Sequence, residues 1–559
     1  MEKQALKYIL FTSLFWTLAA HAQWARDFEV NSPRENIYGL PAAELQRSVM
    51  AGRKHALFYP VAATSLLIPY EPMKTFFNSA ENDPVRALLF RLAQVVTPFK
   101  SMNEVFSWLG LHAYPQNDDE RNPNPLPSLS TREKELPMGA TLMDSHGRKG
   151  LTFSCATCHS ADLFGVKVLG LSNRFPRAND FFHEGKRVAP YINSYIFKDM
   201  LKSTEEDRLM FVDSKESIKY VGTKQPVVLG LDTSLAQVAM SLSRREQDPY
   251  ATKSPNSYKN PRPNKLEKMI ADSKPAVWWT LKYKNRWLSD GSILSGNPVH
   301  TNFLWNEIGR GTDLKALEKW LLDNDQKIRE LTSAVFASKP PRYEKFFGVH
   351  SLDIDKAKRG QKHFVNACAK CHGTYMKGWD LPEAGTLSDE ELLQNVQLTY
   401  HKKTPVRDVG TDPGRYLGMR EFADALNSLQ ISKSIGTVVE PQKGYVPPPL
   451  DGIWARWPYF HNNSAPNLCA LLTKASARPV VYWAGEARDK DRDFDQECVG
   501  YPIADKTPLA WTQNKDLFYD TRKEGMRNTG HDEGIFLNDG VEVFSAVEKS
   551  ELLEFLKTL

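Results

Sequence analysis

The chain contains the same short pattern twice, as Cys155-Ala-Thr-Cys158-His159 and as Cys368-Ala-Lys-Cys371-His372. In each copy the two thiols are three residues apart, a spacing that lets them add to the two vinyl groups of one porphyrin. The adjacent histidine can then place a ring nitrogen on the iron as the proximal ligand. The pattern therefore predicts two covalently bound haem c groups, with attachment through Cys155, Cys158, Cys368 and Cys371 and iron ligation by His159 and His372.

Structural zinc is the alternative for cysteines and histidines at such spacing, but it requires four ligands that converge on one ion. The other cysteines of the chain, Cys469 and Cys498, form no further Cys-x-x-Cys pair. Each haem motif already ends in its own histidine. The pattern therefore favours haem over zinc.

The first residues indicate export. Lys3 and Lys7 precede a mostly apolar stretch at 8–20, and Ala20-His21-Ala22 offers small residues at the two positions that a signal peptidase reads. We expect residues 1–22 to be a signal peptide cleaved after Ala22, and a periplasmic or secreted protein. A membrane anchor is the alternative, but about thirteen apolar residues are too few to span a bilayer, so we expect no transmembrane segment.

Composition limits the partners. The 559 residues carry a formal net charge of +5, with no basic run that would indicate nucleic-acid binding. In an oxidising compartment Cys469 and Cys498 are expected to form a disulfide. Closing a loop of about 30 residues would stabilise the fold by roughly 3–4 kcal/mol on the chain-entropy model. Two buried free thiols are the alternative.

The part of the chain before the first haem motif divides into two stretches. Residues 23–137 contain helix-like apolar runs such as 85–96 and end in a polar, proline-rich stretch at 114–137 that predicts an exposed loop. We expect this to be an N-terminal extension without haem. The first cytochrome c-type haem domain is expected at 138–338.

That first domain is expected to close on a helix that begins near Thr312 and Asp313. Its apolar stripe is predicted to consist of Leu314, Leu317, Leu321 and Leu322. Lys339-Pro-Pro341 then breaks the helix and marks the boundary.

The second cytochrome c-type haem domain is expected at 352–559. Gly360 and Phe364 lie one helical turn apart before the second haem motif, and a glycine there permits another helix to approach closely. In cytochromes c the terminal helix crosses the first one, and residues 550–559, with apolar side chains at helical spacing, resemble that terminal helix. Residues 472–539 are predicted to be a long insertion of loops. The fold class is therefore mainly α, with two cytochrome c-type haem domains, long loop insertions and a helical N-terminal extension.

An internal duplication predicts that the two haem irons differ in their ligands and therefore in reactivity. Aligning residues 288–292 with residues 460–464 places Ser289 opposite His461. An iron with two strong side-chain ligands serves electron transfer, whereas an iron with one protein ligand keeps a position for O₂ or peroxide. We expect His461 to be the second ligand of haem 2 and haem 1 to stay open. The alternatives are a hydrogen-bonding role for His461 and iron ligation by His183, His300, Met376 or Met419.

The segments 154–159 and 458–468, together with the second cytochrome domain, resemble the bacterial dihaem cytochrome c peroxidase superfamily, which includes the secreted rubber oxygenases. Three features favour the rubber oxygenase branch: the chain is longer than the peroxidases, its N-terminal extension lacks haem, and His461 resembles a ligand of the haem iron. The resemblance implies that His159 is the sole protein ligand of an O₂-binding haem and that His372 and His461 both ligate haem 2. Rubber oxygenases line the distal pocket with aromatic residues, so Trp278, Trp279 and Trp287 are the candidates here, with core packing as the alternative.

The same resemblance leaves several functions open. As an oxygenase, the protein would take O₂ and an apolar polyisoprenoid substrate. As a dihaem peroxidase, it would use H₂O₂ and electrons from a small redox protein or cupredoxin. It would also need a distal acid, for which Glu184 and Glu307 are the candidates, with a surface or capping carboxylate as the alternative for each. Calcium between the haem domains occurs in many members of the superfamily. A non-catalytic electron-transfer cytochrome with two six-coordinate haems is the further alternative.

Overall fold

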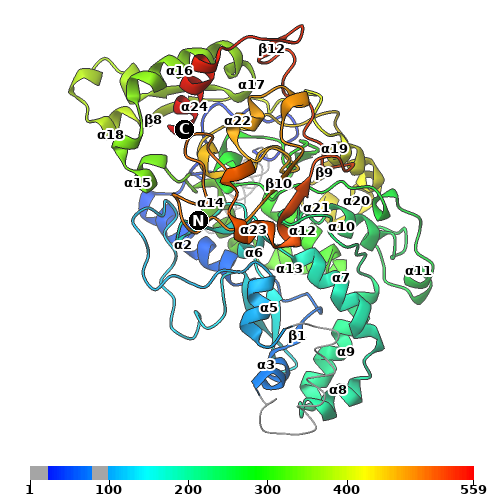
Figure 1. Ribbon diagram of the computed structural model, residues 1–559. Coiled ribbons are helices and arrows are strands. Elements are labelled where there is room, and N and C mark those ends of the chain that lie inside the picture. The colour runs from blue at the N-terminus through cyan, green and yellow to red at the C-terminus, as the bar shows by residue number, and fades with distance from the viewer. Residues whose placement is uncertain (1–22, 79–98) are drawn as a thin grey trace, which may run out of the picture.

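The structure, a computed structural model, describes residues 23–78 and 99–559. The predicted signal peptide and the apolar run at 85–96 lie outside the described residues. The chain is rich in helix and poor in sheet (Figure 1), as the sequence predicts. Within the described ranges, no helix is long and apolar enough to cross a membrane.

The helices before the proline break are α2 (Ala42–Leu57), α3 (Tyr70–Asn78), α5 (Met102–Trp108), α6 (Ala156–His159), α7 (Ala178–Val188), α8 (Ser194–Met200), α9 (Glu205–Lys219), α10 (Leu235–Leu242), α11 (Pro255–Lys259), α12 (Pro298–Ile308), α13 (Leu314–Asp323) and α14 (Asp325–Phe336). Those after it are α15 (Tyr343–Phe347), α16 (Ile354–Ala367), α17 (Ala369–His372), α18 (Asp389–Leu392), α19 (Gly414–Gly418), α20 (Ala423–Ser428), α21 (Gln430–Ser434), α22 (Leu468–Leu471), α23 (Leu509–Thr512) and α24 (Ala546–Lys557).

The strands are short, and they pair antiparallel. They are β1 (Ile68–Pro69), β2 (Ala140–Ser145), β3 (Arg148–Phe153), β4 (Ser160–Leu163), β5 (Val166–Leu169), β6 (Ile293–Ser295), β7 (Thr374–Lys377), β8 (Asn395–Thr399), β9 (Val438–Val439), β10 (Val481–Trp483), β11 (Phe518–Asp520), β12 (Leu537–Asn538) and β13 (Val541–Glu542). A three-stranded sheet in the order β1-β3-β2 leads into the first haem motif, and β4 pairs with β5 directly after it.

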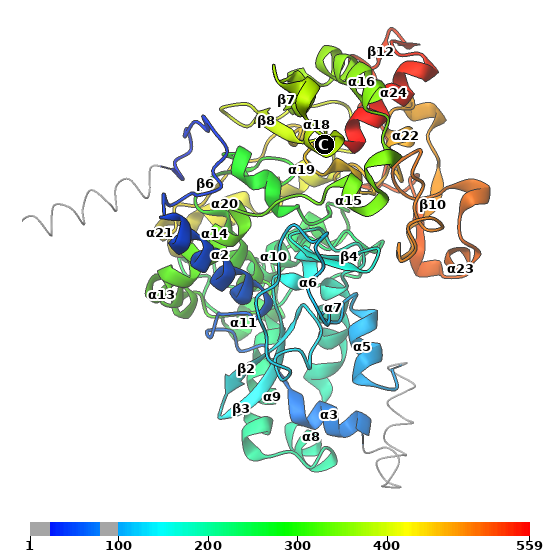
Figure 2. The same ribbon diagram turned by 90° about the vertical axis from the view of Figure 1, so that its left-hand side faces the viewer.

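The predicted helix crossing of the second haem region is confirmed. Helix α16 packs on the C-terminal helix α24, at one end of the molecule (Figures 1 and 2). A Cβ atom at Gly360 would lie 1.9 Å from the Glu551 carbonyl oxygen, so only glycine permits this approach. Beside it the rings of Phe364 and Phe555 pack with centroids 5.3 Å apart. His363 Nε2 bonds the Glu551 carboxylate at 2.9 Å.

The same crossing occurs in the first half of the chain, between α2 and α14. A Cβ atom at Gly52 would lie 1.9 Å from the Glu330 carbonyl oxygen. His55, three residues after this glycine, bonds the Glu330 carboxylate at 2.8 Å. His363 stands in the same position after Gly360. The duplication therefore includes α2, which lies within residues 23–137.

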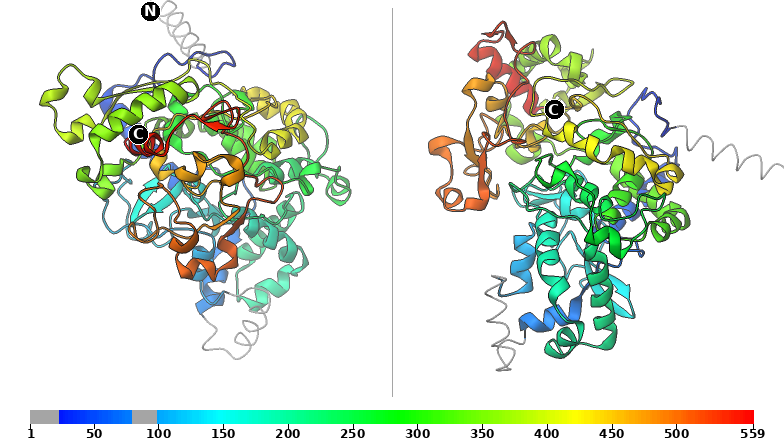
Figure 3. Two further views of the ribbon diagram at one scale, coloured as in Figure 1. Left: turned by 45° about the horizontal axis from the view of Figure 1, so that its top comes forward. Right: turned by 90° about the vertical axis from the view of Figure 1, so that its right-hand side faces the viewer.

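The two halves of the chain interlock rather than stack as separate units (Figure 3). The β4–β5 hairpin buries Leu163 and Val166 in the same apolar cluster as Trp454 of the second half. In return, Met419 and Phe422 join the apolar cluster of the first half, where β9 pairs with β6. The predicted domains at 138–338 and 352–559 are consecutive segments of the chain. In the structure, elements of each segment pack into the core of the other.

Several smaller expectations can be compared with the structure. Asp313 caps α13 by accepting from the Ala316 N–H at 2.9 Å, and Leu314, Leu317 and Leu321 are buried as predicted. Leu322 is a correction, because it is 66% exposed. It lies one residue beyond Leu321, and the helical rotation of about 100° per residue turns it away from the core.

The predicted loops are also present. Residues 114–137 have turns and extended backbone in place of helix, and 472–539 contains short elements between loops. Cys469 and Cys498 form the expected disulfide. The loop insertion folds back against the first half, where the Arg177 guanidinium bonds the Asp516 carboxylate at 2.5 Å.

Candidate haem sites

In the second haem motif, a hydrogen bond determines which ring nitrogen of the histidine carries the proton. His372 ends α17, and its Nδ1 lies 2.8 Å from the Pro448 carbonyl oxygen. A carbonyl oxygen only accepts, so Nδ1 holds the proton and donates, and Nε2 keeps its lone pair. Burial lowers the pKa of His372 to about 4, which keeps the ring neutral. This is the state in which an imidazole ligates a metal.

A second imidazole, that of His531, faces His372. The two ring centroids are 6.3 Å apart, with an angle of 57° between the ring planes. With metal–nitrogen bonds of about 2 Å and about 1 Å more to each ring centre, two imidazoles on opposite sides of one iron would have centroids roughly 6 Å apart. The spacing therefore fits an iron held between His372 and His531.

The backbone around His531 is fixed by a close approach of two loops. The His531 N–H donates to the Val409 carbonyl at 2.7 Å, and His531 has a φ of 57°. A Cβ atom at Gly530 would lie 2.2 Å from the carbonyl carbon of Gly410, so the contact requires glycine. Arg478 adds a hydrogen bond to the Gly530 carbonyl at 2.8 Å.

The His531 ring has an unused nitrogen. Its Nδ1 is buried and has no hydrogen-bond partner among the described residues. Burial and the neighbouring His372 lower the pKa of His531 to about 3, so the ring is neutral. A buried polar atom without a partner costs free energy unless a ligand or ion satisfies it. This fits a residue that completes its bonding on a metal.

His461 has different surroundings. Its ring stacks on Tyr445, with centroids 3.9 Å apart, and its Nε2 is buried without a hydrogen-bond partner in the described part of the chain. Burial, with Arg415 and Lys274 nearby, lowers the pKa of His461 to about 3. The ring contacts thus bring His531 to His372 and His461 to Tyr445. Iron ligation by His461 stays a prediction.

The alignment that singled out His461 has a structural basis. Its first pair, Leu288 and Phe460, has φ angles of 70° and 63°, and its fourth pair, Gly291 and Asn463, has φ angles of 66° and 62°. Each turn is closed by an antiparallel bridge, Trp287 to Ile293 in the first copy and Tyr459 to Ala465 in the second. The two segments therefore form the same turn. In the second copy the ring of Phe460 packs against that of His531, with centroids 5.8 Å apart.

The first haem motif places His159 at the end of α6. Trp278 contacts the His159 ring, with centroids 5.7 Å apart. The Ala276 carbonyl lies beside this ring and raises its pKa, while burial has the larger effect and lowers the pKa to about 4. Nδ1 has no hydrogen bond of good geometry within the described ranges. Ala276 corresponds to Pro448 in the duplication, so both proximal rings have a backbone carbonyl from equivalent positions.

The predicted distal tryptophans are engaged in packing. The Trp279 indole donates to the Asp451 carbonyl at 2.8 Å, across the two halves. The Trp287 indole donates to the Gly296 carbonyl at 2.9 Å and packs against Phe336 with centroids 6.2 Å apart. Trp278 is the one of the three tryptophans whose ring contacts His159. A distal role for Trp279 and Trp287 stays a prediction.

The carboxylate candidates for peroxidase chemistry differ in burial. Glu307 is fully buried and accepts hydrogen bonds from Tyr59, from Arg310 at 3.0 Å and from Thr312 at 2.6 Å. These bonds fit a structural link more closely than a free acid. Glu184 is partly exposed and forms an ion pair with Arg187 at 2.7 Å.

The other ligand candidates lie in four different elements, and one of them, His300, is in α12. Met419 is buried in the apolar cluster of the first half. Met376 is in β7, and the Nδ1 of His183 in α7 is buried without a hydrogen-bond partner in the described part of the chain.

The residues present fit haem. The four motif cysteines are unpaired, so their thiols are available to bond the porphyrin vinyl groups. His372 and His531 would hold the iron of haem 2, and His159 the iron of haem 1.

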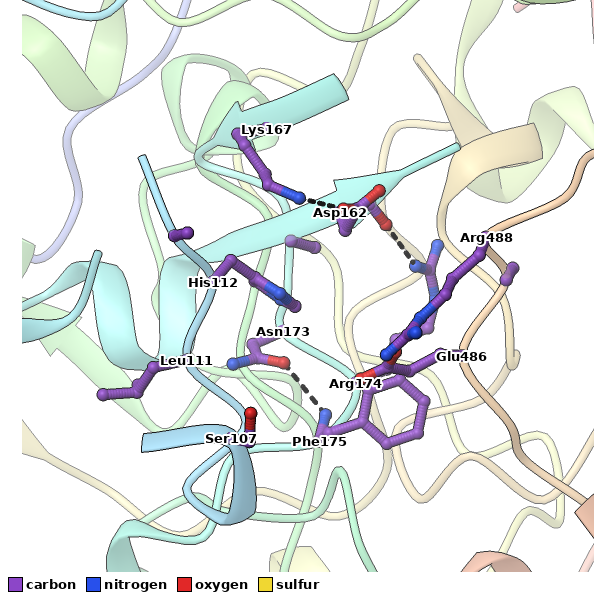
Figure 4. A pocket seen from close by; sticks show the side chains of 13 residues that line it. Ser107, Leu111, His112, Asp162, Lys167, Asn173, Arg174, Phe175, Glu486 and Arg488 are labelled. Atoms are coloured by element: carbon purple, nitrogen blue, oxygen red, sulfur yellow. Dashed lines mark hydrogen bonds and ion pairs between the residues drawn. The ribbon is translucent and has the colours of Figure 1, made fainter. Parts of the chain in front are cut away.

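A cavity of about 220 Å³ lies beside the hairpin that follows the first haem motif (Figure 4). His112, Asp162 and Lys167 line it from the first half, and Glu486 and Arg488 line it from the insertion. Lys167 and Asp162 form an ion pair, and so do Arg488 and Glu486. Four charged groups of the cavity wall are therefore paired with one another, and Arg174 also lines the cavity.

Comparison with known proteins gives one family match and two relatives. Residues 444–484 match the family described as RoxA-like, cytochrome c-like. The uncharacterized protein y4iJ of Sinorhizobium fredii (strain NBRC 101917 / NGR234) is 28% identical over 269 residues, 40% of this chain and 41% of that protein. The uncharacterized protein y4iM of the same organism is 28% identical over 228 residues, 37% of this chain and 49% of that protein.

The chain thus spans less than half the length of each relative, and the names of these relatives assign no activity. The family match includes the turn with His461 and bears on the rubber oxygenase-like cytochromes, not on the peroxidases. It supports a cytochrome of the rubber oxygenase-like family in general, with covalently bound haem c.

Proposed function

We propose that the chain is an exported dihaem c-type cytochrome oxidoreductase in which haem 1 is open to O₂ or peroxide and haem 2 is held by two imidazoles. The observation that supports this most strongly is the 6.3 Å separation between the rings of His372 and His531. The second haem motif thus has two neutral imidazoles facing each other. The ring contact of His159 is with Trp278, which is not an iron ligand.

This difference between the motifs assigns different tasks to them. A haem with an open position supplies O₂ or peroxide activation, and a haem with two strong ligands supplies electron storage and transfer. His159 positions the first group, and the Trp278 ring beside it limits how the imidazole can rotate. His372 and His531 hold the second group between loops that Gly410 and Gly530 bring together.

For the substrate we propose an apolar compound with C=C bonds, such as a polyisoprenoid, which the protein cleaves as a dioxygenase. The RoxA-like match at residues 444–484 supports this choice over a peroxidase. The buried aromatic residues near the first motif, Trp278 among them, provide apolar surroundings.

The test uses the mature holoprotein. A pyridine haemochrome assay should give two haems per chain, and incubation with polyisoprene and O₂ should release cleavage products with carbonyl ends. Turnover of H₂O₂ with reduced cytochrome c, in the absence of polyisoprene cleavage, would identify a peroxidase instead. Two haems without response to O₂, H₂O₂ or cyanide would identify an electron carrier.

A further inference from the structure

Four basic side chains gather between the two haem motifs. They come from both halves of the chain: Arg174, Lys274, Lys284 and Arg456. Arg174 and Lys284 are buried, with 9% and 5% of their surface exposed. Lys274 and Arg456 are half-buried, and together with Arg174 they line one small cavity. The cluster therefore places positive charge at the contact between the halves.

Backbone carbonyls, not carboxylates, receive the hydrogen bonds of this cluster. Arg174 donates to the carbonyls of Ala455 at 2.9 Å and Trp457 at 3.0 Å. Lys274 donates to the Arg456 carbonyl at 3.1 Å and also to the Pro458 carbonyl. Arg456 donates to the Pro449 carbonyl at 2.7 Å. Among the described residues, no carboxylate forms an ion pair with any of the four.

Neighbouring charges in the cluster repel one another, with Arg456 beside both lysines. Burial lowers the pKa of Lys274, and the neighbouring Arg456 and Arg174 lower it further. Burial and Arg456 lower the pKa of Lys284 to about 7. Buried charges are costly unless they are paired, because the interior solvates them poorly. The arrangement is one that an anion would stabilise.

The cluster also lies next to the haem histidines. Arg456 donates to the Pro449 carbonyl, and His372 donates to the carbonyl of the adjacent Pro448. Asn173, the neighbour of Arg174, donates its backbone N–H to the Cys158 carbonyl at 3.0 Å. Figure 4 shows Arg174 between the hairpin of the first motif and the insertion. Basic side chains from both halves thus meet beside both motifs.

We propose that Arg174, Lys274, Lys284 and Arg456 form a cradle for the haem propionates, so that the carboxylates of the two haems meet at the contact between the halves. This inference rests on the proposed presence of two haems. Each haem has two propionates, so four carboxylates would balance four cations. The cradle positions the haems and sets their reduction potentials, since a cation beside a propionate offsets the negative charge that stabilises ferric iron.

Arg245 provides the matched control. It is a fully buried arginine that also donates to backbone carbonyls, those of Thr312 at 2.9 Å and Ile308 at 3.2 Å. Its acidic neighbour is Asp313, which raises its pKa against the effect of burial. It is therefore a buried cation outside the cluster.

The test compares Arg456→Met and Lys274→Met with Arg245→Leu in the holoprotein, after a pyridine haemochrome assay has established the haem count. Redox titration should show a lower reduction potential for at least one haem in each cradle variant, and wild-type potentials in Arg245→Leu. The propionate bending modes in resonance Raman spectra should shift in the cradle variants only. Wild-type potentials and modes in variants that hold both haems would overturn the cradle, whereas fewer than two haems in the wild type would overturn the proposed function.

If the variants do not fold, a measurement on the wild-type holoprotein tests the propionate cradle. With haem propionates labelled by ¹³C, infrared difference spectra on reduction should show ionised carboxylate bands that respond slowly to transfer into D₂O, because their donors are buried. An immediate response, or bands of protonated acids, would contradict the cradle.

Discussion

At the residue scale, the haem motifs could be recognised from sequence, whereas the contact between the rings of His372 and His531 could not. The residues of Cys-x-x-Cys-His are neighbours in the sequence, so the motif can be recognised without knowledge of the fold. His531 reaches His372 through a contact between distant loops, which depends on Gly410 and Gly530. It is one of 13 histidines and has no local pattern around it. The aligned turn is present in both copies, and iron ligation by His461, whose ring stacks on Tyr445, stays a prediction.

A first prediction concerns Glu307, which the sequence offered as a distal acid. Glu307→Ala should destabilise the holoprotein by roughly 3–5 kcal/mol, because it leaves Arg310 buried without its partner. Denaturant unfolding followed by tryptophan fluorescence would measure the change. Glu184→Ala is the control, and its exposed ion pair should change stability by less than about 1 kcal/mol. A stable Glu307→Ala protein that has lost only peroxide reactivity would favour the catalytic role instead.

At the element scale, the crossing of α16 and α24 could be predicted from the sequence, and the equivalent crossing of α2 and α14 could not. Gly360 and Phe364 stand directly before the second haem motif, so the pattern links them to the haem. Gly52 lies far upstream of Cys155, and the intervening β-strands and loops hide the relation. Only the structure shows that α2 meets α14 as α16 meets α24.

A second prediction tests both crossings. Gly52→Ala and Gly360→Ala should each destabilise the protein by about 1–3 kcal/mol or more, because the added Cβ would overlap a carbonyl oxygen of the partner helix. Gly185→Ala in α7 is the matched control, since nothing lies within 4 Å of a Cβ at that position. It should raise stability by about 0.5–1 kcal/mol through the higher helix propensity of alanine. Equal effects in the three variants, measured as unfolding midpoints, would contradict the close crossings.

A third prediction concerns the disulfide that ties α22 to Cys498. Replacing both Cys469 and Cys498 with serine should lower stability by roughly 3–4 kcal/mol on the chain-entropy model. Thermal unfolding with and without a reductant would measure the effect, and the wild type in reductant should approach the variant. A reductant-insensitive wild type with the same midpoint as the variant would show that the bond contributes nothing.

At the scale of the whole molecule, the sequence predicted two haem units in order, whereas the structure interlocks their cores. The β4–β5 hairpin packs with Trp454, and Met419 packs with the first half. Apolar patterns in the sequence show which side chains are buried but not against which partner they pack. For this reason the class of fold and the motifs were predictable, and the exchange of elements was not.

A fourth prediction follows from this exchange. Because each half buries part of the other, the holoprotein should unfold in one cooperative transition, with haem absorbance and tryptophan fluorescence changing together. Two separated transitions, one for each haem, would show that the halves are independent domains.

The central claim is that haem 2 is closed by two imidazoles while haem 1 is open. Electron paramagnetic resonance of the ferric holoprotein tests it most directly, in the wild type, in His531→Ala and in His461→Ala. The wild type should show one low-spin and one high-spin haem, since two imidazoles produce a low-spin iron and a single one leaves it high-spin. In His531→Ala the low-spin signal should become high-spin, and in His461→Ala it should persist. Two low-spin haems in the wild type, or a low-spin signal that survives the loss of His531 and disappears with His461, would contradict the account.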